Sequence, residues 1–145
     1  MAGPVQKSTR RSAASSGPPE VTFFIDRSLG KHVVPEALRA AGALVEIHDD
    51  HFSADTPDDV WLSSVSMRGW VVLTKDKAIR YRKNERAAVE EASGRLLVLT
   101  AGNITGKEIA AAFVGALPRI RQLSAKQAPP FIATVSTSGT VSLLP

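Results

Sequence analysis

Four short apolar runs alternate with stretches of helical periodicity, and this alternation limits the folds open to the chain. The runs are VTFFI at 21–25, LVEI at 44–47, WVVLT at 70–74 and a segment centred on LLVL at 95–100. Between and after them, the sequence predicts helices at 33–41, from 56 toward 68, at 85–92 and from 105 past 117. Strands that alternate with helices are typical of an α/β protein with a mostly parallel central sheet and helices on both faces.

Several element ends carry specific signals. We expect Thr56 to cap a helix that begins at Pro57, with Asp59 as its capping-box acid, and Thr105 to form a second capping box with Glu108. Pro118 is expected to kink or briefly interrupt the last helix. The runs at 131–135 and 141–144, separated by Ser138-Gly139, predict a C-terminal β-hairpin.

Composition bounds the class of protein. A chain of 145 residues that is 43% hydrophobic is long enough for one domain with a real core. We interpret residues 1–19, which contain three basic residues and no acid, as a disordered basic leader, and residues 20–145 as the folded domain. The absence of cysteine excludes disulfides and thiolate chemistry. No apolar run approaches the roughly 20 residues that cross a bilayer, so we expect a cytoplasmic protein without a membrane span.

Charge is segregated along the folded part. Six acids and no Lys or Arg occur between residues 46 and 59, whereas six bases and only two acids occur between residues 75 and 86. Such blocks form either two solvated faces or a metal site beside a phosphate-binding surface. The acids are Glu46, Asp49, Asp50, Asp55, Asp58 and Asp59, and the bases are Lys75, Lys77, Arg80, Arg82, Lys83 and Arg86.

Three acids fall where an open parallel sheet places its functional sites, at or beside the carboxyl ends of strands. Asp26 follows the first strand, Asp76 lies just past the third, and Asp58 opens the helix before the third. Clustered carboxylates repel one another unless a cation lies between them, and hard divalent ions such as Mg²⁺ or Mn²⁺ prefer oxygen ligands. Asp59 has a structural role to fill in the capping box, and Asp50 either lines the rim of the same cleft or only solubilises a loop.

Two other kinds of site are poorly supported. His48 and His51 lie among acids, but their spacing does not form a convincing zinc set. The segment 102–107 is one residue short of a phosphate-binding loop between its glycines, and Glu108 stands where Ser or Thr is required. Each acid also has an ordinary alternative as a turn, cap or ion-pair residue.

The ordered set of motifs resembles PIN-like domains, and among them the toxins of the VapC type. The segments that carry the resemblance are FIDRSLG at 24–30, LRAAG at 38–42, HDDHF at 48–52, DTPDDVWL at 55–62 and GWVVLTKDK at 69–77. The likeness covers roughly residues 21–145. It implies a compact three-layer α/β/α fold, a ribonuclease that depends on Mg²⁺ or Mn²⁺ and belongs to a type II toxin–antitoxin system, a homodimer, and an antitoxin protein as partner.

The resemblance also implies roles for individual residues. Asp26, Asp58 and Asp76 match the metal-binding, catalytic acids, and Thr74 matches a supporting hydroxyl. Many relatives place a further acid where this chain has Ala78, so the number of metals stays open, with Asp59, Asp50, Asn103 or water as candidates for that ligand position. RNA, with tRNA as one candidate, would be the substrate, and Tyr81 could stack on a base. The residues expected to contact its backbone are Lys75, Lys77, Arg80, Arg82 and Lys83.

Two alternatives remain at this point. Ala78 keeps open a catalytically inactive PIN-like module that binds nucleic acid without cleaving it. A phosphoacceptor like that of response regulators also gathers acids at strand ends, but it requires an acid pair after the first strand, which is lacking beside Asp26.

Overall fold

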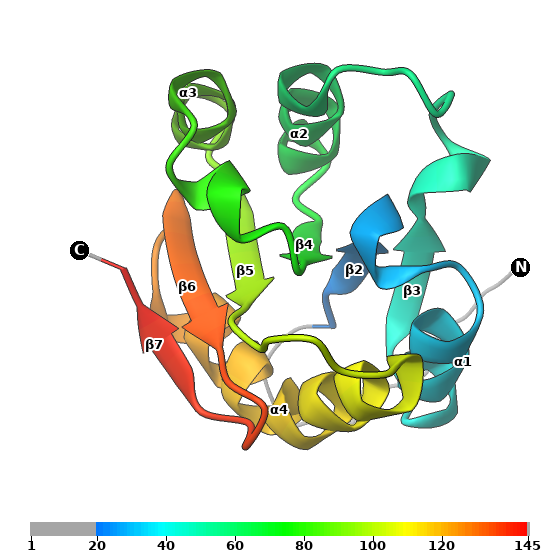
Figure 1. Ribbon diagram of the computed structural model, residues 1–145. Coiled ribbons are helices and arrows are strands. Elements are labelled where there is room, and N and C mark those ends of the chain that lie inside the picture. The colour runs from blue at the N-terminus through cyan, green and yellow to red at the C-terminus, as the bar shows by residue number, and fades with distance from the viewer. Residues whose placement is uncertain (1–19, 145) are drawn as a thin grey trace, which may run out of the picture.

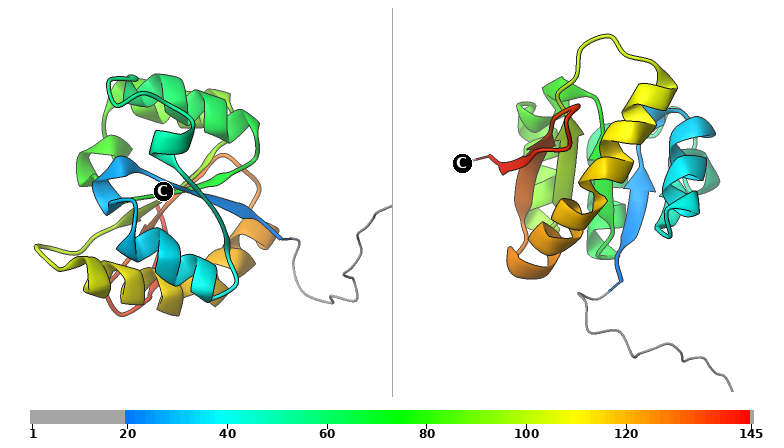
Figure 2. Two further views of the ribbon diagram at one scale, coloured as in Figure 1. Left: turned by 90° about the vertical axis from the view of Figure 1, so that its right-hand side faces the viewer. Right: turned by 90° about the horizontal axis from the view of Figure 1, so that it is seen from below.

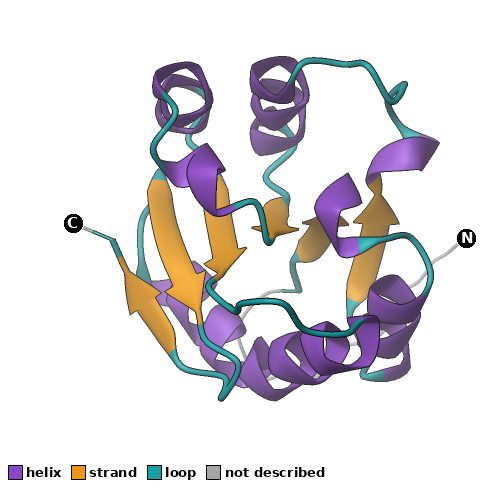
Figure 3. Cartoon of the chain, in the orientation of Figure 1, coloured by secondary structure: helices purple, strands orange, loops and turns teal. Residues whose placement is uncertain are grey.

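The computed structural model describes residues 20–144 and has three layers, with one sheet between two pairs of helices (Figures 1 and 3). The layer above the sheet in Figure 1 contains α2 (Asp58–Met67) and α3 (Lys83–Glu91). The layer below contains α1 (Val33–Ala40) and α4 (Gly106–Lys126). This is the α/β/α architecture that the alternating pattern and the resemblance predict.

The sheet has six strands in the order β3-β2-β4-β5-β6-β7. All neighbours are parallel except β6 and β7, which form the predicted antiparallel hairpin at one edge (Figure 2). In the register, Phe24 of β2 lies beside Glu46 of β3 on one side and beside Val72 of β4 on the other. The strands are β2 (Thr22–Ile25), β3 (Leu44–Ile47), β4 (Val71–Thr74), β5 (Arg95–Leu99), β6 (Phe131–Val135) and β7 (Val141–Leu143).

Both faces of the sheet are covered by apolar side chains, which is why the parallel strands appear in the sequence as continuous apolar runs. Successive residues of β2 alternate between the faces, because Phe23 and Ile25 join the cluster under α1 and α4 while Phe24 joins the cluster under α2 and α3. Phe113 of α4 and Trp61 of α2 are the largest buried side chains that these helices contribute.

Each of the first three strands in chain order is followed by one turn of 3₁₀ helix, and these turns lie beside the site described below. They are η2 (Arg27–Leu29) after β2, η3 (His48–Asp50) after β3 and η4 (Lys77–Arg80) after β4.

The predicted cap of α2 is wrong. The helix begins at Asp58 with Pro57 as the capping residue, and no side chain in the described part of the chain accepts a hydrogen bond there. Pro57 has an extended ψ of 145°, so it precedes the first turn, and Thr56 lies one residue too early to cap. The Thr56 hydroxyl instead lies 3.1 Å from Ser53 Oγ, and Asp59 has no capping-box partner among the residues that the structure describes. Asp58 and Asp59 therefore both lie in the first helical turn.

The predicted effect of Pro118 is also corrected, because α4 continues without interruption from Gly106 to Lys126. Pro118 lies on the exposed side of the helix, while Leu117 and Ile120 bury their side chains in the core. Water can hydrate the carbonyl that the proline leaves without its usual partner, and core packing holds the helix on both sides of it.

The second capping box has the predicted form. The Glu108 N–H donates to Thr105 Oγ1 at 3.2 Å, and the Thr105 N–H donates to Glu108 Oε1 at 2.9 Å. These bonds stabilise the charged form and hold the pKa of Glu108 below its usual value.

We expect Thr105→Ala to lower the free energy of unfolding by about 1 kcal/mol, because it removes a hydroxyl acceptor from the start of α4. Urea unfolding at neutral pH would measure the loss. Thr137→Ala is the matched control, since Thr137 is exposed in the hairpin turn, and it should change stability by less than about 0.5 kcal/mol. Equal losses in the two variants would contradict the assigned cap.

Two further expectations from the sequence concern the N-terminal leader and a membrane span. The predicted leader, residues 1–19, lies outside the described residues. Within residues 20–144, none of the helices combines the length and the apolar character needed to cross a membrane.

Candidate active site

One open cleft brings together the three acids that the sequence singled out. Asp26, Asp58 and Asp76 all line it, although they come from the end of β2, the start of α2 and the turn after β4. The cleft lies at the carboxyl ends of β2 and β4, which are adjacent and parallel. Its remaining lining residues are Arg27, Ser28, His48, Ala54, Thr56, Trp61 and Lys75.

Asp26 is the most buried of the three acids, with 8% of its surface exposed. Its Oδ2 accepts hydrogen bonds from Ser28 Oγ at 2.8 Å and from Thr74 Oγ1 at 2.6 Å. Its backbone N–H donates to the Leu73 carbonyl at 3.1 Å, which extends the β2–β4 pairing to this residue. The two hydroxyls fix one carboxylate oxygen, and Oδ1 accepts no hydrogen bond from the described residues.

Asp58 is oriented by Trp61, three residues later on the same helix. The Trp61 Nε1–H donates to Asp58 Oδ1 at 2.9 Å, and the indole is 1% exposed. A buried indole N–H needs a hydrogen-bond partner, so the tryptophan has two functions, filling the core under α2 and holding a carboxylate at the rim of the cleft.

Asp76 caps η4 and is held by one contact to a backbone N–H and one to a side-chain hydroxyl. Its Oδ1 accepts the Ala78 N–H at 3.2 Å, and its own N–H donates to Thr74 Oγ1 at 3.0 Å. Thr74 therefore connects Asp26 to Asp76, because its hydroxyl contacts both residues. This contact is the geometric basis for the supporting role expected of Thr74.

The other oxygens of Asp58 and Asp76 share one cation. Arg82 Nη1 lies 3.0 Å from Asp76 Oδ2 and 3.6 Å from Asp58 Oδ2. Each of the three acids therefore has one oxygen fixed by uncharged donors and one oxygen left for a positive charge. For Asp58 and Asp76 that charge is Arg82, which the sequence analysis assigned to the RNA backbone.

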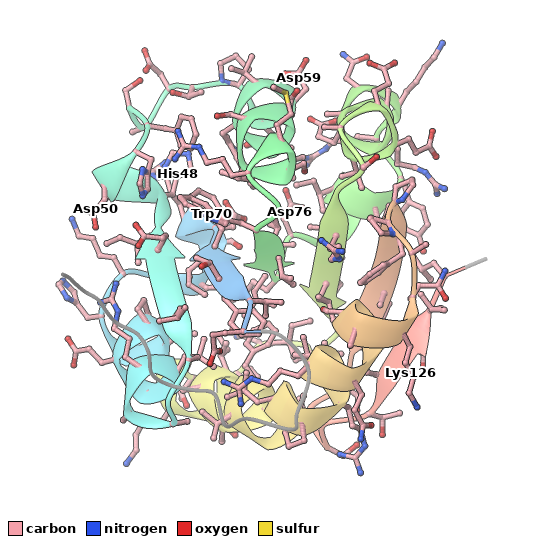
Figure 4. All side chains as sticks on the ribbon, turned by 180° about the vertical axis from the view of Figure 1, so that it is seen from behind. His48, Asp50, Asp59, Trp70, Asp76 and Lys126 are labelled. Atoms are coloured by element: carbon pink, nitrogen blue, oxygen red, sulfur yellow. The ribbon has the colours of Figure 1, made fainter. Side chains whose placement is uncertain are left out.

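The additional acids lie elsewhere. Asp59 faces α3, in a depression lined by both helices, and does not line the cleft. Asp50 is exposed on η3 and also lies outside the cleft lining (Figure 4). Across residues 20–144, no three histidine or acidic side chains are close enough together to form a ready-made metal site. A cation bound to Asp26, Asp58 and Asp76 would therefore require these side chains to move.

A group of basic residues lies beside the cleft, on the segment that follows β4. Lys75 lines it, and Lys77 and Lys83 are exposed on the turn and helix that follow. The Arg80 guanidinium lies 4.7 Å from the centroid of the Tyr81 ring, and Tyr81 is 67% exposed. An exposed aromatic ring among cations is the kind of surface on which single-stranded nucleic acid stacks.

The two histidines of the HDDH segment have different environments. His48 is buried against Phe24, Phe52 and Trp61, and its Nδ1 has no hydrogen-bond partner among residues 20–144. Burial lowers the pKa of His48, and the nearby Asp26 carboxylate opposes that shift. His51 Nε2 instead lies 2.7 Å from Glu46 Oε1.

Asp49 is paired on the outer side of this region. Its carboxylate lies 3.3 Å from Lys31 Nζ and 3.4 Å from Arg27 Nε. The hydrogen bond from Lys31 and the nearby positive charges lower the pKa of Asp49. We therefore interpret Asp49 as an ion-pair residue beside the cleft, which it does not line.

The sequence did not indicate the roles of four residues at the cleft. Ser28, His48 and Trp61 line it, and Arg82 forms ion pairs with two of its acids. Trp61 lies three residues after Asp58 in a helix, a spacing that places two side chains on the same face, so this contact could have been anticipated. Ser28 lies two residues after Asp26, where a hydroxyl can reach back to a carboxylate. The neighbouring strands β2 and β4 bring Ser28 and Thr74 together, 46 residues apart.

The three-layer fold is the one expected of a PIN-like domain, and comparison of the sequence agrees. Residues 21–101 match the family described as PIN like domain. This match covers more than half of the chain and includes β2, β3, β4 and β5 with the three acids of the cleft. The chain therefore belongs to the PIN-like domain family.

A curated relative indicates which type of PIN-like domain the chain is. It is 32% identical over 126 residues to the Mycobacterium tuberculosis protein named "Putative ribonuclease VapC45", covering 84% of this chain and 91% of that one. The aligned length exceeds that of the family match, and the chain is of the VapC type as the resemblance predicts. No solved structure matches the sequence.

Proposed function

We propose that the protein is a divalent-metal-dependent endoribonuclease and the toxin of a type II toxin–antitoxin system. The observation that carries this proposal is the cleft in which Asp26, Asp58 and Asp76 each keep one carboxylate oxygen free of uncharged donors. The relative named as a ribonuclease supports a nuclease rather than another hydrolase. The inactive binding module was the alternative, and a site with three oriented acids argues against it.

The donor set fits Mg²⁺ or Mn²⁺. Asp26, Asp58 and Asp76 offer oxygen ligands only, which is the chemistry that both ions prefer. Two of these carboxylates already share a cation, Arg82, so positive charge is favourable at this position. When bound, the ion would polarise a phosphodiester and lower the pKa of an attacking water.

The remaining residues have roles around that centre. Ser28 and Thr74 keep the Asp26 carboxylate in one orientation through their hydroxyls. Lys75, at the rim of the cleft, is positioned to attract a phosphate, and Lys77, Arg80 and Lys83 extend the positive surface along the RNA. The proposal includes RNA as substrate, with tRNA as one candidate, action in the cytoplasm as a homodimer, and an antitoxin protein that covers the cleft.

Cleavage of labelled tRNA and of generic single-stranded RNA tests the proposal. Purified protein would be assayed with Mg²⁺, with Mn²⁺ and with EDTA, beside the variant Asp76→Asn. We expect cleavage that needs the metal and is lost in the variant. Cleavage that persists in EDTA, or that Asp76→Asn retains, would contradict the proposal. RNA binding without cleavage of either RNA would favour the inactive module.

Trp61→Phe tests how Asp58 is positioned. The substitution keeps an aromatic ring in the core but removes the Nε1–H that donates to Asp58 Oδ1. Loss of a partner that orients a metal ligand typically costs about 10- to 100-fold in metal affinity or activity, and we expect a cleavage rate reduced about 10-fold.

Trp70→Phe is the matched control for this prediction. Trp70 stacks on the same Phe24 ring, with 6.0 Å between centroids, but its indole donates no hydrogen bond to an acid in the described part of the chain. It should retain cleavage within about twofold. If Trp61→Phe cleaves RNA as fast as Trp70→Phe, the indole does not position Asp58.

A further inference from the structure

A single guanidinium nitrogen bridges two of the proposed metal ligands. Arg82 Nη1 donates a hydrogen bond to Asp76 Oδ2 at 3.0 Å and lies 3.6 Å from Asp58 Oδ2. The two acids come from different elements, α2 and the turn after β4, so this arginine is the link that joins them. The oxygens it contacts are those that the uncharged donors leave free.

The arginine side chain has no other polar partner among residues 20–144. Its backbone is fixed, because the Arg82 N–H donates to the Ala78 carbonyl at 3.1 Å and its carbonyl accepts the first hydrogen bond of α3. The side chain is 46% exposed, and the rest of the guanidinium is free to be solvated. It can therefore leave the acids without disturbing the fold.

The position of Arg82 has a direct consequence for metal binding. An ion ligated by the oxygens of Asp58 and Asp76 that the uncharged donors leave free would contact the same oxygens that Nη1 now approaches. Both the ion and the Arg82 guanidinium are cationic, so the arginine cannot stay beside the bound ion. It must move away, and its ion pairs with the acids oppose the binding of the metal.

Building on the proposed function, we infer that Arg82 is a positioning residue that substitutes for the divalent ion in the metal-free protein. It holds Asp58 and Asp76 together against their mutual repulsion, and the incoming ion displaces it. The arginine thus keeps the site assembled while lowering its affinity for metal.

Manganese affinity measures this competition without reference to cleavage. Mn²⁺ would be titrated into wild-type protein, Arg82→Gln, Arg82→Lys and Lys83→Gln, with free Mn²⁺ counted by electron paramagnetic resonance. Partly exposed ion pairs of this kind are each worth a factor of about 1.4 to 5, and Arg82 makes two of them, so we expect Arg82→Gln to bind Mn²⁺ about 2- to 25-fold more tightly. Arg82→Lys, which keeps the charge, should lie between wild type and Arg82→Gln.

Lys83→Gln is the matched control. It removes the same charge from the exposed neighbouring residue, which contacts neither Asp58 nor Asp76 in the described chain. It should stay within about twofold of wild type. The inference is overturned if Lys83→Gln tightens binding as much as Arg82→Gln, or if Arg82→Gln binds Mn²⁺ no more tightly than wild type.

Asp76→Asn in the same titration separates this inference from the proposed function. If wild type binds Mn²⁺ and Asp76→Asn does not, the metal site stands, and an unchanged affinity in Arg82→Gln refutes only the role of Arg82. If neither wild type nor Arg82→Gln binds Mn²⁺, the proposed metal site itself fails. A thermal melt adds a second readout, since Mn²⁺ should raise the Tm of Arg82→Gln by more than it raises that of wild type.

Discussion

Asp26→Asn is expected to reduce RNA cleavage at least about 100-fold while leaving the protein folded. Asparagine has the same shape, so the hydroxyls of Ser28 and Thr74 can still hydrogen-bond to its side-chain oxygen. The substitution removes the negative charge and replaces one oxygen by an NH₂ donor, which cannot bind a cation. Loss of one electrostatic contact that stabilises a transition state costs about 10²- to 10³-fold in rate.

Asp55→Asn provides the control for this prediction. Asp55 belongs to the same acidic block but is exposed, and its carboxylate accepts a hydrogen bond only from Ser53 Oγ, at 2.7 Å, within the described chain. It should cleave RNA at the wild-type rate. Circular dichroism and urea unfolding would show whether both variants are folded. Metal-dependent cleavage by folded Asp26→Asn at a rate near that of Asp55→Asn would remove Asp26 from the site.

Phe24→Ala is expected to have the largest effect on stability, lowering the free energy of unfolding by about 3–5 kcal/mol. Phe24 is fully buried in β2, two residues before Asp26. Its ring centroid lies 5.4 Å from that of Trp61 and 6.0 Å from those of Phe52 and Trp70. Truncation leaves a cavity beneath α2 and removes all three aromatic contacts. A loss of this size is a large part of the 5–15 kcal/mol that stabilises a typical domain.

Phe52→Ala is the matched control for Phe24→Ala. Phe52 contacts the same Phe24 ring but lies at the edge of the cluster and is only partly buried. Its truncation should cost clearly less than that of Phe24, because surrounding water can fill part of the space. Urea unfolding of both variants under one set of conditions gives the comparison. Equal costs would show that the cluster is not centred on Phe24.

The sequence was most informative where one local signal determined the structure. The buried strands, the Thr105 capping box and the C-terminal hairpin all have the predicted form, because apolar runs, cap chemistry and turn residues act over a few neighbouring positions. The predictions were wrong where two local signals compete. Pro57 and Thr56 both favour a helix start, and the proline took the capping position. Pro118 disfavours helix, but core packing on both sides of it prevails.

The sequence could predict the acids of the site but not the contacts that orient them. Asp26 and Asp76 follow strands that are adjacent and parallel, so topology alone brings them to one edge of the sheet. The contacts that orient them depend on side-chain conformations and on pairs distant in sequence. Arg82 lies in a block of bases, and nothing in that pattern distinguishes it from Lys83, yet it alone of the two contacts Asp58 and Asp76.

Diffraction from crystals soaked in Mn²⁺, recorded at a wavelength where manganese scatters anomalously, tests the proposed metal site most directly. We expect one anomalous peak in the cleft, with carboxylate oxygens of Asp26, Asp58 and Asp76 at about 2.1 Å, a distance close to that of Mg²⁺ in oxygen sites. The Arg82 guanidinium should have moved away from both acids. Well-ordered manganese bound elsewhere, with this cleft empty and Arg82 still bridging Asp58 and Asp76, would contradict the central claim that these three acids form the metal site.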